Sequence, residues 1–263
     1  TVEALMYNGV ALQSGTSHYF GQKFSKAYGI KYLNRNNELD YVYQTSWGVT
    51  TRMIGGLIMV HSDENGLVLP PKIAPRQVAI VPIGDDEQVK AICNSILEKL
   101  TDADIVAFAD YSEKSPGFKF AEHEVNGIPV RIELGKRDLE NGTITLARRD
   151  TREKITVSAD CDIVAEVKKL LNDIQTNLFN RALERRNELT YECTTLKQVE
   201  EIMNAKPGFV KAMWCGDEEC ELKMKEIRGT KSRCILEDEK PISDTCVVCG
   251  KKAKHLVVWG IQY

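Results

Sequence analysis

The 263-residue sequence lacks any long apolar run and any marked excess of one charge. No stretch approaches the roughly 20 apolar residues needed to span a bilayer, and the N-terminus lacks the basic, apolar and small-residue order of a secretion signal. The 35 basic residues nearly balance the 38 acidic ones, which argues against the uniformly basic surface of a non-specific nucleic-acid binder. We therefore expect a soluble, cytoplasmic protein without membrane contact, in which local basic clusters meet any nucleic acid.

The eight cysteines do not form the framework of a disulfide-bonded secreted domain. Four are scattered, whereas the other four form two short-spaced pairs, Cys215-x4-Cys220 and Cys246-x2-Cys249. Zn²⁺ takes four soft ligands in a tetrahedron, and each pair can supply two thiolates from one tight turn. The spacing predicts a zinc site in a reducing compartment. Two other interpretations stay open, namely four unmetallated core cysteines and a zinc-ribbon interaction or thiol redox protein using Cys246 and Cys249.

Short β-prone segments and two helical patterns alternate over the first 75 residues. The spacing predicts strands at 4–7, 30–33, 40–46 and 67–69 and helices at 19–28 and 50–61. We expect the first helix to bury Phe20, Phe24 and Ala27, and the second to be a buried helix containing Met53, Ile54, Leu57 and Ile58. His18 is expected in a loop just before the first helix. The pattern is typical of the end of an antiparallel sheet, and prolines at 70, 71 and 75 form a stiff exit.

Buried strands alternate with amphipathic helices from residue 76 to about 185, which predicts an α/β layer with a mixed sheet. The expected strands are 77–82, 104–108, 128–134, 143–147 and 154–158, and the expected helices are 86–100, 118–125 and a long one from about 161. Beyond residue 186 the pattern becomes short, with a helix at 195–203, strands at 209–214 and 256–262, and cysteine-bearing turns between them. We therefore expect a multidomain chain of α+β and α/β class.

Residues 44–52 (Gln-Thr-Ser-Trp-Gly-Val-Thr-Thr-Arg) place Arg52 in the first turn of a helix, where free backbone N–H groups and a guanidinium favour a polyphosphate. Together with 13–18 (Gln-Ser-Gly-Thr-Ser-His) and 66–71 (Gly-Leu-Val-Leu-Pro-Pro), they resemble prolyl-tRNA synthetase, a class II aminoacyl-tRNA synthetase, of the archaeal and eukaryotic type. The likeness continues through 116–138 and the cysteine-bearing tail. It covers essentially the whole chain.

The resemblance implies the C-terminal part of a larger enzyme, because two earlier class II motifs have no counterpart in the sequence. The implied domains are the end of the catalytic domain (1–75), an α/β anticodon-binding domain (76–185) and a small α+β zinc-binding domain (186–263). The implied function is ATP-dependent attachment of L-proline to its tRNA through prolyl-adenylate, with ATP, Mg²⁺ and Zn²⁺ as cofactors. A homodimer is implied for the full-length enzyme, and this chain alone is expected to be inactive.

By the same resemblance, two groups of residues face the small substrates. The matching positions are Gln13, Thr16, Thr50 and Arg52 for ATP, and His18, Ser46, Trp47 and Gly48 for proline. No general acid or base is expected in this chain. Without the resemblance, Trp47 would be assigned to packing at a strand end.

Residues 116–138 resemble the anticodon-recognition segment of this family. Unstacked RNA bases are recognised by aromatic stacking and by hydrogen bonds to their edges, so a mixture of Phe, Glu, Arg and Asp is suitable. The matching positions are Phe120, Glu124, Arg131, Asp138 and Lys154. Without the resemblance, Phe120 and Arg131 would be an ordinary helix-face aromatic and a solvated strand residue. The alternative function is a non-catalytic tRNA-binding fragment or paralogue.

Overall fold

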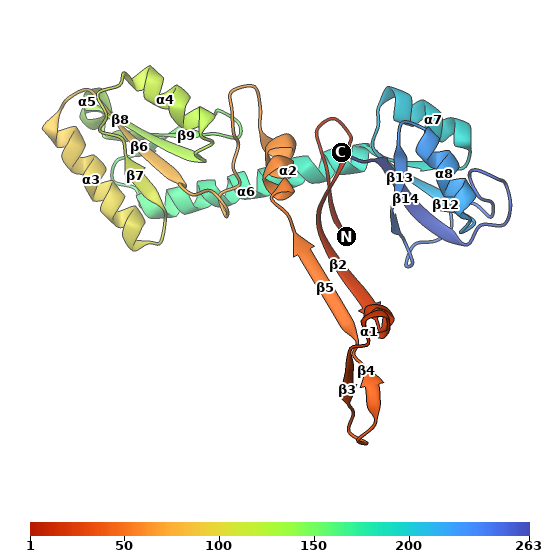
Figure 1. Ribbon diagram of the computed structural model, residues 1–263. Coiled ribbons are helices and arrows are strands. Elements are labelled where there is room, and N and C mark those ends of the chain that lie inside the picture. The colour runs from red at the N-terminus through yellow and green to blue at the C-terminus, as the bar shows by residue number, and fades with distance from the viewer. The chain divides into compact units, whose positions relative to one another are not determined.

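The computed structural model describes residues 1–263, which divide into two compact units (Figure 1). Unit 2 is the continuous segment 61–185, whereas unit 1 combines residues 1–60 with residues 186–263. None of the helices combines the length and apolar character that crossing a membrane requires.

Unit 2 is built on a five-stranded mixed sheet in the order β10-β9-β8-β6-β7. The strands are β6 (Val78–Ile83), β7 (Ala107–Ala109), β8 (Val130–Gly135), β9 (Thr143–Arg148) and β10 (Lys154–Ser158). β6 runs parallel to β7 and β8, whereas β9 is antiparallel to both of its neighbours. The helices are α3 (Glu87–Asp102), α4 (Pro116–Val125), α5 (Lys136–Glu140) and α6 (Ile163–Glu188). The predicted mixed sheet is confirmed, and α5 is the element that the sequence pattern missed.

Alternation along β8 gives the two faces of this sheet different chemistry. Val130, Ile132 and Leu134 are fully buried in a core shared with α3 and α6. The intervening Arg131 and Glu133 point to the other face because successive side chains of a strand alternate. That face is covered by α4, which begins where Ser115 accepts a hydrogen bond from the N–H of Phe118 and Pro116 occupies the first turn. Arg131 and Glu133 therefore lie between α4 and the five-stranded sheet.

The segment that follows α2 is fixed to the end of α4 by one arginine. Arg149, only 2 % exposed, donates to both carboxylate oxygens of Asp63 at 2.8 and 2.6 Å and to the carbonyl oxygen of Glu124 at 2.9 Å. The hydrogen bonds from Arg149 hold the pKa of Asp63 well below its usual value of 3.8. Because this pKa is depressed, the stabilisation is present above about pH 4 and is lost as the pH falls further.

Asp63→Asn is expected to lower the free energy of unfolding of this unit by about 1–2 kcal/mol at pH 7, since it leaves a buried guanidinium without its anion. The difference from wild type should shrink as the pH is lowered from 5 to 2, because wild-type protein loses the same interaction by protonation. Urea unfolding of both proteins between pH 5 and pH 2 measures the difference in their free energies of unfolding. Glu64→Gln is the matched control, since Glu64 is 84 % exposed and lies 3.7 Å from Arg152. A difference that stays constant with pH would contradict the prediction.

The first 60 residues of unit 1 form a small sheet and a separate two-stranded ribbon. The sheet has the order β1-β2-β5, from β1 (Val2–Leu5), β2 (Ala11–Gly21) and β5 (Gln44–Val49), and β3 (Lys31–Leu33) pairs with β4 (Leu39–Tyr41). The helices are α1 (Lys23–Tyr28) and α2 (Arg52–His61). Three expectations are wrong: β2 extends through the predicted start of the first helix, 40–46 is divided between β4 and β5, and 67–69 is not a strand.

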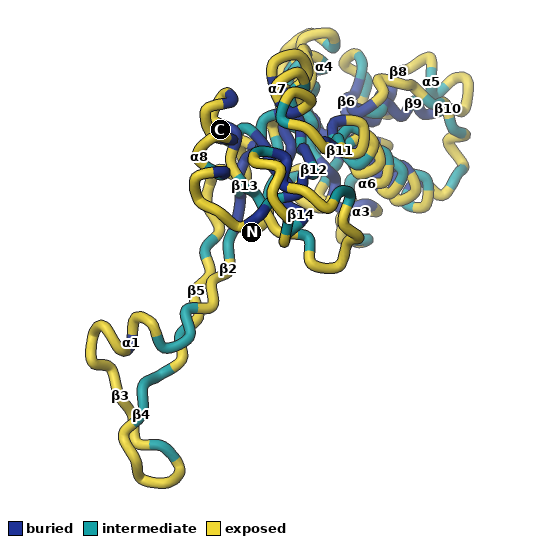
Figure 2. Tube along the Cα trace, turned by 90° about the vertical axis from the view of Figure 1, so that its right-hand side faces the viewer, coloured by how far each residue is buried: buried dark blue, intermediate teal, exposed yellow.

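The predicted burial of both helices in this region is also wrong. Phe20 lies in β2 rather than in a helix, and Phe24 is 39 % exposed. On α2, Met53 and Ile54 are 48 % and 61 % exposed, and Gly56 is the residue of this helix that is buried. Figure 2 shows α1, β3 and β5 as mostly exposed chain. The apolar periodicity correctly predicts the helix α2, but no other element of the chain covers its apolar side chains.

The remainder of unit 1 is a four-stranded sheet in the order β11-β12-β14-β13 with two helices. Its elements are β11 (Thr190–Cys193), α7 (Leu196–Ala205), β12 (Phe209–Trp214), α8 (Glu218–Glu226), β13 (Thr230–Ile235) and β14 (His255–Ile261). Val199, Met203, Val210 and the fully buried Trp259 form its core. The chain end is joined to the start of β2, because the N–H of Tyr263 donates to the carbonyl oxygen of Ala11 at 3.0 Å.

Candidate functional site

The residues matched to ATP and proline lie on β2, β5 and the start of α2. In the antiparallel register Thr16 opposes Gly48 and His18 opposes Ser46, so these four positions share one face. Oγ1 of Thr16 lies 3.2 Å from Nε2 of His18. His18 is thus in a strand and not in the predicted loop. Trp47 opposes Ser17, which puts it on the other face, and it is 78 % exposed.

Thr50 and Arg52 lie where β5 ends and α2 begins. Oγ1 of Thr50 accepts a hydrogen bond from the backbone N–H of Arg52 at 3.2 Å, which caps the helix start. The predicted position of Arg52 in the first helical turn is confirmed. Gln13 lies further back on β2, next to an irregularity in its pairing with β1.

Four of the five residues matched to anticodon recognition converge on α4, β8 and β10. The guanidinium carbon of Arg131 lies 4.1 Å from the ring centre of Phe120, and Nζ of Lys154 lies 5.3 Å from it. Nη1 of Arg131 donates to Glu124 at 3.2 Å and to the carbonyl oxygen of Phe120 at 3.4 Å. An aromatic ring, a carboxylate and two cations therefore form one surface at the side of α4.

The charged side chains of this surface differ in their exposure to solvent. The side chain of Arg131 is 9 % exposed, whereas those of Glu124 and Lys154 are 33 % and 52 % exposed. Arg131 is accordingly not the solvated strand residue that composition alone suggested. The exposed carboxylate and ammonium are the groups that a ligand can reach.

Asp138 has a clear local role at the start of α5. Its Oδ2 accepts a hydrogen bond from the N–H of Gly135 at 2.8 Å, within a capping arrangement of this short helix. No contact joins it to Phe120, Glu124, Arg131 or Lys154 among the interactions described here. Its assignment to base recognition stays a prediction.

The buried side of α4 carries a second polar cluster, around Asp110. His123 places Nε2 3.0 Å from Asp110 Oδ2, Lys119 donates to the carbonyl oxygen of Asp110 at 2.7 Å, and Ser112 donates to its Oδ1 at 2.6 Å. Burial lowers the pKa of His123, although Asp110 partly opposes this effect.

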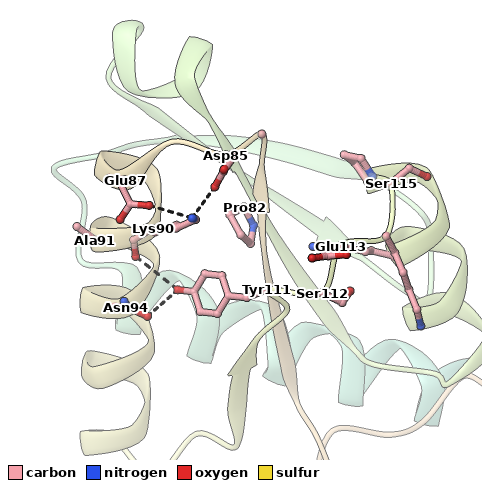
Figure 3. A pocket seen from close by; sticks show the side chains of 14 residues that line it. Pro82, Asp85, Glu87, Lys90, Ala91, Asn94, Tyr111, Ser112, Glu113 and Ser115 are labelled. Atoms are coloured by element: carbon pink, nitrogen blue, oxygen red, sulfur yellow. Dashed lines mark hydrogen bonds and ion pairs between the residues drawn. The ribbon is translucent and has the colours of Figure 1, made fainter.

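A cavity of about 870 Å³ lies at the carboxyl ends of β6 and β7 (Figure 3). Nζ of Lys90 forms ion pairs with Oδ1 of Asp85 at 2.5 Å and with Oε1 of Glu87 at 2.9 Å. The hydroxyl of Tyr111 donates to Oδ1 of Asn94 at 2.6 Å. The sequence pattern did not single out this cavity. Its buried polar atoms all have partners, so its lining presents no buried group that awaits a ligand.

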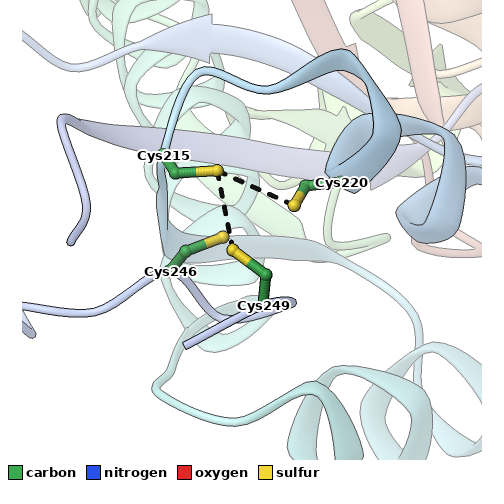
Figure 4. Close-up of side chains that lie close together, drawn as sticks. All are labelled: Cys215, Cys220, Cys246 and Cys249. Atoms are coloured by element: carbon green, nitrogen blue, oxygen red, sulfur yellow. Dashed lines mark hydrogen bonds between the residues drawn. The ribbon is translucent and has the colours of Figure 1, made fainter. Parts of the chain in front are cut away.

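The four paired cysteines come together, although they belong to two separate segments (Figure 4). Cys215 follows β12, Cys220 lies in the first turn of α8, and Cys246 and Cys249 flank a tight turn that ends at Gly250. The four sulfur atoms lie within 4.8 Å of one another, whereas Cys193 and Cys234 lie outside the group. The location of Cys220 in a helix differs from the expected cysteine turn.

The separations between sulfur atoms fit a tetrahedral metal site. Sγ of Cys215 lies 3.7 Å from Sγ of both Cys220 and Cys249. Zn–S bonds of about 2.3 Å in a regular tetrahedron give sulfur atoms about 3.8 Å apart. A hydrogen bond from the backbone N–H of Lys251 lowers the pKa of Cys249 to about 7, which favours a thiolate. This geometry favours a metal site over four unrelated core cysteines.

Comparisons with known proteins cover both units. Residues 77–170 match the family described as anticodon binding domain, and residues 196–263 match the family described as prolyl-tRNA synthetase, C-terminal. The proline–tRNA ligases of Clostridium novyi (strain NT) and Ruminiclostridium cellulolyticum are 50 % and 49 % identical to the chain over 264 residues. Proline–tRNA ligase 2 of Bacillus thuringiensis subsp. konkukian is 49 % identical over 267 residues.

Each of these alignments covers 100 % of the chain and 55 % of the relative, so the chain spans about half the length of the curated relatives it matches. The three relatives are bacterial, and they do not confirm the archaeal and eukaryotic type. The chain is therefore similar over its whole length to prolyl-tRNA synthetases, and it contains one region that matches an anticodon-binding domain and another that matches the C-terminal domain of that family.

Proposed function

We propose that this chain supplies the anticodon-reading surface of a proline–tRNA ligase, which joins L-proline to its tRNA in an ATP-dependent reaction. The observation that carries the proposal is the convergence of Phe120, Glu124, Arg131 and Lys154 within the region that matches an anticodon-binding domain. The relatives are named proline–tRNA ligases, and proline codons require guanines in the matching anticodons.

The chemistry of this surface suits guanine. An unstacked base can pack on the ring of Phe120, and such stacking is worth about 1–3 kcal/mol per base. The Watson–Crick edge of guanine offers two N–H donors, which the exposed carboxylate of Glu124 can accept, and a carbonyl acceptor, to which the ammonium of Lys154 can donate. Asp138 is proposed as a further contact on the strength of the family resemblance.

The test is the binding of two tRNA transcripts that differ in the anticodon alone. Wild-type chain is expected to bind the transcript with a proline anticodon at least about tenfold more tightly than one whose two guanines are replaced, since each recognised base contributes about 1–3 kcal/mol. Equal affinity for both transcripts would refute anticodon reading by this chain.

We propose that residues 1–75 are the end of a class II catalytic domain, that 76–185 bind the anticodon and that 186–263 are a zinc-binding domain. Gln13, Thr16, Thr50 and Arg52 would contact ATP with its Mg²⁺, and His18, Ser46, Trp47 and Gly48 would line the proline pocket. Support comes from the shared face of His18, Ser46, Thr16 and Gly48 and from the capped start of α2. Trp47 is the least supported member, because it lies on the other face of the hairpin.

In this reaction the carboxylate of proline attacks the α-phosphate of ATP, which gives prolyl-adenylate and pyrophosphate, and the prolyl group then passes to the terminal ribose of tRNA. The chain's part is to bind and orient: the guanidinium of Arg52 and the positive end of the α2 helix dipole offset negative charge. The exposed apolar side chains of α2 agree with a catalytic domain that has a further layer. We also propose the archaeal and eukaryotic type, a homodimeric full-length enzyme and a cytoplasmic location, all on the family resemblance.

The alternative is a non-catalytic tRNA-binding fragment or paralogue. It shares the surface formed by Phe120, Glu124, Arg131 and Lys154, and it requires no adenylate chemistry from residues 1–75. We expect this polypeptide to show no proline-dependent exchange of pyrophosphate into ATP, and a longer polypeptide with the upstream class II motifs to show it. Exchange by neither would support the non-catalytic alternative, and exchange by this chain alone would contradict the expectation of inactivity.

We propose Zn²⁺ for the cysteine cluster, held by Cys215, Cys220, Cys246 and Cys249. Four thiolates leave no open coordination position, so the metal would have a structural and not a catalytic role. Its place beside β12 and β14 would join α8 to the turn at 246–250.

A further inference from the structure

Glu133 is a buried carboxylate at the centre of the surface around Phe120. Its side chain is 6 % exposed. Oε1 accepts a hydrogen bond from Nε of Arg131 at 3.0 Å and forms an ion pair with its Nη2 at 2.9 Å, and Oε2 accepts a hydrogen bond from Nζ of Lys154 at 2.7 Å. Each carboxylate oxygen thus binds a different cation. No motif pointed to this residue.

The strand register explains why one carboxylate reaches both cations. Arg131 pairs with Ala147 across β8 and β9, and Ala147 pairs with Lys154 across β9 and β10, so the three residues form one row on the same face. The short side chain of Ala147 lies between those of Arg131 and Lys154, so it does not separate the two cations from the carboxylate of Glu133. Glu133 is two residues along β8 and therefore points to the same face.

The two cations need an anion between them. Both lie beside the same ring, 4.1 and 5.3 Å from its centre, and two like charges brought together in a partly buried site repel each other. Glu133 completes an alternating chain of charges that runs Glu124, Arg131, Glu133, Lys154. Nε and Nη1 of Arg131 donate hydrogen bonds within this group and Nη2 forms an ion pair with Glu133, so the guanidinium is engaged with protein acceptors.

We propose that Glu133 is a positioning residue for anticodon recognition: it holds Arg131 against Phe120, so that Arg131 in turn orients Glu124, and it holds Lys154 beside the same ring. In this arrangement Glu124 and Lys154 form hydrogen bonds with the base, and Phe120 stacks on it. Arg131 does not contact the base; it packs against the ring of Phe120 and holds the carboxylate of Glu124. The inference rests on the proposed function of this surface. Beyond that function, the inference assigns the hydrogen bonds to the base to the exposed Glu124 and Lys154, and it assigns the positioning of these two side chains to the buried Glu133 and Arg131.

The test is Glu133→Gln, which keeps the size of the side chain and one carbonyl acceptor but removes the charge. We expect about a tenfold loss of affinity for the transcript with the proline anticodon and little change for the transcript with the substituted anticodon. The discrimination between the two should therefore collapse, which a purely structural role would not cause. Thermal melting checks that the fold is retained.

Glu122→Gln is the matched control, because Glu122 lies on α4, the helix that carries Phe120, and accepts hydrogen bonds from Lys114 at 2.8 Å through both carboxylate oxygens. A second measurement combines Glu133→Gln with Lys154→Met. If Glu133 acts by holding Lys154, the double variant should bind no worse than the worse single variant, because coupled residues are not additive.

The outcomes separate the two proposals. Equal weakening for both transcripts, or additive losses in the double variant, would overturn the role of Glu133. If Glu133→Gln discriminates like wild type while Phe120→Ala does not, the anticodon surface stands and the positioning role is wrong. If wild-type chain itself does not discriminate, the proposed function fails, whatever Glu133 does.

Discussion

Cys215→Ser is expected to abolish metal binding and to lower the thermal stability of residues 186–263 strongly. Structural zinc sites contribute on the order of 10 kcal/mol to folding, and a hydroxyl is a poor substitute for a thiolate. Cys215 lies centrally, 3.7 Å from the sulfur atoms of both Cys220 and Cys249. The region keeps an apolar core around the fully buried Trp259, so we expect a destabilised domain and not complete unfolding.

The measurements are metal content by mass spectrometry and the melting transition with and without chelator. Cys234→Ser is the control, since Cys234 is exposed and lies outside the four-sulfur group. Wild-type protein is expected to carry about one zinc per chain, as four ligands in one tetrahedron require. Carefully prepared wild-type protein without metal, or a Cys215→Ser variant with full metal content, would contradict the assignment.

Glu124→Ala should weaken binding of a tRNA with a proline anticodon by about 10- to 100-fold, because the base edge loses its acceptor and a recognised edge is worth about 1–3 kcal/mol. Binding of a tRNA with another anticodon should change much less. Arg131 keeps its bonds to Glu133 in this variant, so the support beneath Phe120 remains.

Competition binding with the two transcripts measures this effect at fixed salt, since phosphate contacts make affinity depend on salt. Glu122→Ala, two residues earlier on α4, serves as control for lost charge on the same helix. An equal loss for both tRNAs would mean that Glu124 contributes general affinity and does not read the base.

The core of unit 2 could be predicted because its sequence carries two independent signals. Short buried apolar runs mark the strands, and amphipathic periodicity marks the helices between them, although α4 begins at Pro116 and not at the predicted residue 118. Both signals are local, and the structure agrees with them. The predicted range of the long helix from about 161 was also close to α6.

The errors come from contacts that local patterns do not report. Ser14, Gly15, Thr16 and Ser17 have the composition of a loop, yet pairing with β1 and β5 on either side makes them a strand. Glu133 was missed because nothing in its neighbours along the chain shows that α4 covers its face. The cysteine spacing predicted that the four thiols come together, but it did not reveal that Cys220 lies in the first turn of a helix.

The bond between Tyr263 and Ala11 gives the last residue a mechanical connection to the hairpin. Gln262 also bridges to Ala11, so the end of the chain is attached in parallel to the first residue of β2. Seven residues along that strand lies His18. The connection between the cysteine-bearing sheet and the strand of the proposed proline pocket therefore lies within unit 1, where Arg233 of β13 also bonds Glu3 of β1 at 3.3 Å.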